Sequence, residues 1–157
     1  MVIETIRFGK IEVNEKEMVT FKDGLPGLED LNKFIMINDD NTEPLKWMQS
    51  VEDGNIVLPV INPFTVLGDY ELEVNDHEIE LLKLWEMKDL YVLCVVLIPD
   101  KIEEMTANLA APILINTATG NAKQVLIDRK DHAIKQPIFE AVYQYIEGSM
   151  KNVSSLA

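Results

Sequence analysis

The chain has 157 residues, a length that suits one domain with a hydrophobic core and is too short for two ordinary domains. Its apolar fraction of 47% argues against disorder, and its net charge of -13 disfavours nucleic acid and anionic membranes as partners at neutral pH. The same charge attracts cationic partners, unless it serves only to keep the protein soluble.

Short apolar segments separated by turn-forming residues run along most of the chain. The first is VIETIRF at residues 2–8, where polar and apolar side chains alternate imperfectly. Further predicted strands are residues 18–21, 33–37, 45–50, 56–61, 70–74, 90–98, 113–117 and 124–128. Because no regular succession of long helices connects them, the pattern predicts an all-β fold, a small antiparallel barrel-like or sandwich domain with one or two short helices.

The stretch FKDGLPGLEDL, residues 21–31, has a Gly-x-x-Gly spacing that needs an interpretation. A glycine loop that clamps a nucleic-acid backbone needs basic neighbours, whereas acidic residues outnumber Lys22 on both flanks. Pro26 supplies the fixed φ of a second turn position, and Gly27 supplies the positive φ of the third. The residues therefore predict a type II turn across positions 25–28.

A short helix is predicted after Asn75, over one mouth of the sheet structure. The residues NDHE at 75–78 open with good capping side chains, and Ile79, Leu82 and Trp85 follow at near-helical spacing. Residues 102–109 are expected to form a brief turn or loop.

A second helix is predicted near the C-terminus, where five apolar residues form one stripe: Phe139, Val142, Tyr143, Ile146 and Met150. Such a stripe is expected to pack on the protein's own sheet, with docking in a partner's groove as the alternative. We expect a single domain over residues 1–150, followed by a frayed tail at residues 151–157.

The sequence shows no spacing typical of a zinc site, a catalytic triad or a cofactor motif. Cys94 lies inside the apolar run at residues 90–98, which predicts a buried structural thiol and suits a reducing cytoplasm. That run is about half the length of a membrane-spanning helix, and the N-terminus lacks a secretory signal pattern. We therefore expect a cytoplasmic protein that binds no metal or cofactor and does not enter membranes.

Carboxylates concentrate in one short span that includes Glu71, Glu73, Asp76, Glu78 and Glu80. Alternation at residues 70–74 would place Glu71 and Glu73 on one face of a strand. Such acids could bind a hard cation or act as general acid and base, but a solvated strand face explains the same pattern. Binding is favoured over catalysis, and a carboxylate-based metal-binding domain or small enzyme remains the alternative.

Six segments carry a resemblance to a known family. They are GLPGLED at residues 24–30, LKWMQSV at 45–51, PVINPF at 59–64, DYEL at 69–72, MTANLAAPILIN at 105–116 and AKQVL at 122–126. Their order and spacing, from Ile3 to about Ile138, resemble the FliW family of flagellar assembly factors. MTANLAAPILIN is the most specific of the six segments.

The resemblance implies a small all-β protein without enzymatic activity that binds flagellin in the bacterial cytoplasm. It also implies binding of CsrA, a dimeric RNA-binding repressor of flagellin translation, which cannot hold the flagellin message while it is bound. New flagellin would compete for the factor and free the repressor, so that two complexes share one limited pool by mass action. The acidic charge adds that the bound factor would repel incoming RNA.

Eight residues are the candidates for partner contact. Asp69, Glu71 and Glu73 are expected to form a charged rim that faces the basic repressor. Phe64 lies at a predicted loop tip and is either an anchor for a partner or part of the core. The other candidates form the loop before a strong strand: Met105, Thr106, Asn108 and Leu109. An acidic mimic of nucleic acid that binds basic proteins broadly is a third possibility.

Overall fold

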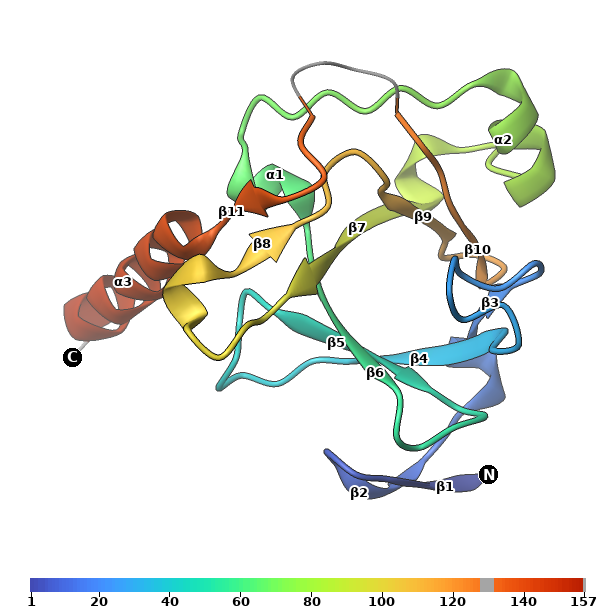
Figure 1. The fold of residues 1–157 in the computed structure, drawn as a ribbon, viewed down its shortest axis with the longest axis horizontal. Coiled ribbons are helices and arrows are strands. Elements are labelled where there is room, and N and C mark those ends of the chain that lie inside the picture. Colours follow the sequence, from blue (N-terminus) through green and yellow to red (C-terminus); the bar gives the residue numbers. More distant parts are fainter. Residues whose placement is uncertain (128–131, 157) are drawn as a thin grey trace.

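The computed structural model describes residues 1–127 and 132–156, and its centre is a closed barrel (Figure 1). The barrel strands are β3 (Val19–Phe21), β4 (Lys33–Ile37), β5 (Lys46–Ser50), β6 (Val57–Ile61), β7 (Leu90–Leu97), β9 (Ile113–Asn116) and β10 (Asn121–Gln124). Each pairs with the next in the order β7, β6, β5, β4, β3, β10, β9, and β9 pairs with β7 to close the ring. All these pairs are antiparallel except β10 with β3. The prediction of an all-β, barrel-like domain is confirmed.

Shorter elements are attached to this barrel. The hairpin of β1 (Val2–Thr5) and β2 (Gly9–Glu12) forms a separate sheet below it in Figure 1, and β8 (Thr106–Ala107) and β11 (Gln136–Pro137) extend it beside β7. The helices are α1 (Pro63–Val66), α2 (Asp76–Leu82) and α3 (Phe139–Leu156), with single 3-10 turns η1 (Glu15–Glu17), η2 (Met87–Asp89) and η3 (Ile102–Glu104).

Three predicted strands differ from the structure. Residues 2–8 do not form one strand, because the chain turns back after Thr5 and Gly9 takes a positive φ of 69°. Residues 70–74 join no strand pairing, although their exposure still alternates. The last barrel strand begins at Asn121 and ends at Gln124, so residues 125–127 lie beyond it, and residue 128 lies outside the described residues.

The short helix α2 is confirmed and is capped at both ends. Asn75 Oδ1 accepts the Glu78 N–H at 2.8 Å, and Lys83 takes a left-handed conformation after the last turn. Leu82 and Ile79 pack against Val125 and Leu114 of the barrel end. Trp85 does not continue this apolar face as predicted, because the helix has ended and its side chain is 70% exposed.

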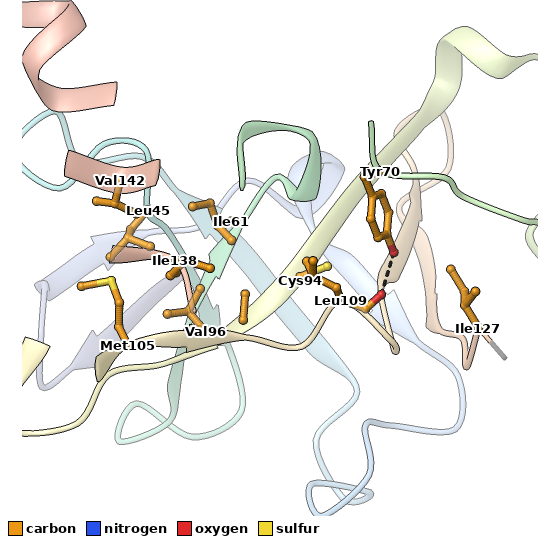
Figure 2. Close-up of a cluster of buried hydrophobic side chains, with 11 residues drawn as sticks. Leu45, Ile61, Tyr70, Cys94, Val96, Met105, Leu109, Ile127, Ile138 and Val142 are labelled. Carbon is orange, nitrogen blue, oxygen red and sulfur yellow. Dashed lines mark hydrogen bonds between the residues drawn. The ribbon is translucent and has the colours of Figure 1, made fainter. Parts of the chain in front are cut away.

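The core below α3 joins residues of β6, β7 and β8 with Leu45, which precedes β5 (Figure 2). Cys94 is fully buried there, as predicted, and burial raises the pKa of its thiol to about 12. Val142 is buried in the same cluster and Phe139 packs on its edge. The other members of the predicted stripe, Tyr143, Ile146 and Met150, are exposed, so the expectation that the whole stripe packs on the sheet was wrong. Among helix residues 139–150, those at the start of α3 reach the barrel.

The predicted turn at residues 25–28 is confirmed. Gly27 has φ of 84°, and the Leu28 N–H donates to the Leu25 carbonyl at 2.8 Å. The Glu29 carboxylate accepts the Gly27 N–H at 3.0 Å, and this backbone hydrogen bond lowers the pKa of Glu29. Gly24 also has a positive φ, of 72°, and a Cβ on it would lie 2.6 Å from Glu29 Cα.

Two glycine substitutions in this turn should differ in cost. Gly24→Ala is expected to lower the free energy of unfolding by about 3 kcal/mol, because it adds a clash with the Glu29 backbone to the strain of a positive φ. Gly27→Ala should cost only about 1 kcal/mol, since nothing lies within 4 Å of its new Cβ. Urea unfolding of both variants measures the difference, and equal losses would contradict the close approach of Gly24 to Glu29.

Candidate functional site

One edge of strand β7 pairs with two different strands along its length. Leu90 to Leu93 pair with β9, whereas Val96 and Leu97 pair with β8. The Asn108 N–H donates to the Val95 carbonyl at 3.0 Å, after which residues 109–112 leave the strand pairing. This excursion is the centre of the MTANLAAPILIN segment.

The excursion is held by hydrogen bonds from elsewhere in the chain. Its backbone bonds with Val125, Ile127 and Ala133 at 2.8 to 2.9 Å. Tyr70 donates its phenol O–H to the Leu109 carbonyl at 2.8 Å, a bond drawn in Figure 2. Burial raises the pKa of this phenol, so it remains a donor throughout the physiological range.

Aromatic rings extend this contact towards the surface. The ring of Tyr70 stacks on His132 with centroids 4.5 Å apart, and Phe64 meets its edge at 5.4 Å. The His132 Nε2 lies 2.6 Å from the Glu71 carbonyl. These contacts fix the path of residues 67–72 over the barrel end and leave Phe64 44% exposed.

An apolar groove of about 440 Å³ lies between the turn and β7, and we call it the motif groove. Its lining residues are Leu25, Pro26, Leu28, Leu58, Val95, Val96, Leu97, Thr106, Asn108, Ala111, Gln124, Ile134 and Lys135. The GLPGLED turn and the MTANLAAPILIN segment, far apart in sequence, therefore border one surface feature. Among the described lining residues none is acidic, although the whole chain carries a net charge of -13.

The eight candidate residues lie in three places. Thr106 and Asn108 line the motif groove. Met105 and Leu109 are 6% and 0% exposed and belong to the core of Figure 2. They therefore do not lie on a partner surface, because the path of the chain before and after β8 turns both side chains inward. The other four are exposed: Phe64 lies in α1, and Asp69, Glu71 and Glu73 lie in the connection from α1 to α2.

Comparisons with known proteins agree on one family. The family model described as "FliW protein" matches residues 2–138. The flagellar assembly factor FliW of Alkaliphilus metalliredigens is 39% identical over 150 residues, covering 95% of this chain and 93% of that protein. The FliW of Thermosipho africanus is 40% identical over 139 residues, covering 88% and 96%. A solved crystal structure of the flagellar assembly factor FliW superposes with a TM-score of 0.82 at 29% identity, covering 88% of this chain and 97% of that one.

The chain belongs to the FliW family. Its relatives are named as flagellar assembly factors, and no enzyme name occurs among those reported. No helix among the described residues is long and apolar enough to cross a membrane.

The carboxylates of the alternative metal-site hypothesis are not gathered into one site in this FliW chain. Glu78 turns towards the barrel and pairs with Lys123 at 2.9 Å, whereas Asp76 is exposed at the start of α2. Over residues 1–127 and 132–156 there is no group of three or more His, Cys, Asp or Glu side chains arranged to hold a metal ion.

Sequence reasoning missed most of the motif groove. It treated Leu25, Pro26 and Leu28 as turn geometry and Leu97 as the end of a buried strand, yet Leu97 is 59% exposed. Ile134, 66% exposed, was also missed. The only signal in the sequence was that both motifs contain or adjoin apolar residues not needed for the core face of a strand. Nothing local in the sequence indicates that Leu25 and Leu97 lie beside the same groove.

Replacement of Tyr70 by Phe tests the support of the excursion. The variant leaves the buried Leu109 carbonyl without the phenol O–H that donates to it, so the free energy of unfolding should fall by about 1–2 kcal/mol. Tyr145→Phe, at a side chain 42% exposed on α3, is the matched control and should change stability by less than about 0.5 kcal/mol. Urea denaturation measures both, and equal stability of the two variants would contradict the role assigned to this hydrogen bond.

Proposed function

We propose that this flagellar assembly factor is a non-enzymatic cytoplasmic binder of two proteins, flagellin and a CsrA-type RNA-binding repressor dimer. It sequesters the repressor and so relieves repression of flagellin translation until flagellin displaces it. The observation that carries the proposal is the motif groove. There the GLPGLED turn and the MTANLAAPILIN segment border an apolar surface that the protein's own elements leave uncovered. Such a surface on a soluble protein is typical of a protein–protein contact.

The motif groove suits flagellin. A subunit that awaits polymerisation still exposes the apolar surface that it will bury in the filament, and an apolar groove can shield part of that surface. The groove offers Pro26, Leu97 and Ile134 as apolar contacts and Thr106 and Asn108 as polar ones. This combination of an apolar centre and a few polar groups resembles the anatomy of protein interfaces in general.

The acidic surface suits the repressor. An RNA-binding protein presents basic residues, and the exposed acids Asp69, Glu71 and Glu73 provide complementary charge on the connection from α1 to α2. A bound partner of net charge -13 also repels the RNA backbone, so repression is relieved without every RNA contact being covered. Affinity for the repressor therefore falls as salt rises, because screening weakens these contacts.

Partner switching then follows from mass action. If flagellin binding lowers affinity for the repressor, each new flagellin subunit releases repressor from a limited pool of the factor. Export of flagellin reverses the exchange.

A displacement titration tests this function and the groove together. The protein is first loaded with the repressor of the same organism, flagellin is added, and light scattering after size exclusion measures the released repressor. The unmodified protein should release repressor as flagellin approaches equimolar amounts. Leu97→Ser, which removes an exposed apolar contact of the groove without changing charge, should require at least about tenfold more flagellin.

Leu126→Ser is the matched control, because Leu126 is 81% exposed and does not line the motif groove. It should behave as the unmodified protein does. Flagellin binding without release of the repressor would contradict partner switching, and equal behaviour of the two variants would contradict the motif groove as the flagellin site.

A further inference from the structure

Helix α3 begins at Phe139, directly after the stretch that the family model matches. None of the described lining residues of the motif groove belongs to this helix, so its surface is separate from that groove. In Figure 1 it projects from the barrel beyond β8 and β11. Its anchor is Val142, which is 6% exposed and packs with Leu45 and Ile138 in the core of Figure 2.

The face that anchors α3 continues past the barrel as an exposed apolar surface. Val142, Ile146 and Met150 follow at four-residue spacing and so lie on one side of the helix. Ile146 is 42% exposed and Met150 is 65% exposed. Together with Tyr145, 42% exposed, they form one wall of a groove of about 550 Å³ whose other wall is Asp40, Asn41 and Glu43. We call this the α3 groove.

The surroundings of the α3 groove are acidic. Helix residues 139–150 include Glu140 and Glu147, which lie outside the groove lining, and no Lys or Arg, and Lys151 follows them. The facing loop, residues 38–45, contributes Asp39, Asp40 and Glu43. The nearest cation on β5, Lys46, is already paired with Glu43 at 3.1 Å. The groove thus combines a largely apolar wall on α3 with an acidic wall on the facing loop.

We propose that the α3 groove docks a protein segment that carries apolar side chains flanked by Lys or Arg. The apolar side chains fill the space between Ile146, Met150 and the loop at residues 40–43, and the basic groups meet the acids at its rim. A second copy of this chain fits poorly, because it would bring Asp40 and Glu43 against a molecule of net charge -13. The site goes beyond the proposed exchange of flagellin and repressor and does not use the motif groove.

Calorimetric titration with two synthetic helical peptides tests the site. One peptide is built from Leu and Lys, and the other has Glu at every Lys position. The Leu/Lys peptide should bind the intact protein, more weakly as salt rises, and the Leu/Glu peptide should not. Ile146→Glu should weaken binding of the Leu/Lys peptide at least tenfold, because it places a charge in the apolar wall.

Ile6→Glu is the matched control, since Ile6 is 79% exposed on the β1–β2 turn and the charge change is identical. It should leave affinity unchanged or raise it slightly. If attraction to the net charge alone held the peptide, both variants would bind it at least as tightly as the intact protein, and the proposal would be overturned. Sedimentation of the intact protein as a dimer that Ile146→Glu dissociates would also overturn it, in favour of self-association.

Discussion

Strand β7 determines the geometry of the whole molecule, because one of its edges pairs with two strands in succession. Pairing with β9 closes the barrel, whereas pairing with β8 builds the extension that carries β11 and leads to α3. The chain between β8 and β9 has to leave the edge and return, and residues 109–112 can do so because Tyr70, Val125, Ile127 and Ala133 satisfy its backbone groups. The motif groove is bordered by this departure on one side and by the turn at residues 25–28 on the other.

Much of the barrel was predictable because its strands carry strong local patterns. The apolar run of β7 and the segments of β4, β5 and β6 were found within a residue or two, and Asn75 marked the start of α2. Residues 125–127 show why a correct burial pattern can still give a wrong strand: Val125 and Ile127 are buried and Leu126 is exposed, but their N–H groups bond to the excursion instead of a strand. Long-range pairing of this kind leaves no local trace.

The candidate site was predictable only in part, for the same reason. Thr106 and Asn108 were found because they belong to a recognisable segment, but two neighbours in that segment, Met105 and Leu109, point into the core. Which side chains of an irregular segment face solvent depends on its tertiary contacts, here above all the Tyr70 hydrogen bond. The exposed part of α3 was missed because a helical stripe shows that a face is apolar and does not show how much of the barrel lies beneath it.

Apolar contact and negative charge are separated between the motif groove and the acidic connection from α1 to α2. The described lining of the motif groove contains Lys135 and no acid, whereas Asp69, Glu71 and Glu73 lie along the connection from α1 to α2. Such a separation allows one small protein to hold partners of different chemistry without a shared set of contacts. It also means that salt should weaken the acidic contacts much more than those of the motif groove.

Hydrogen–deuterium exchange of the full chain with and without flagellin tests the central claim most directly, because it shows where the partner binds without any substitution. The account predicts slower exchange at residues 25–28, 95–97 and 106–111, which surround the motif groove, and no change in the β1–β2 hairpin. Slower exchange confined to the hairpin or to residues 69–73, with the groove segments unaffected, would contradict it.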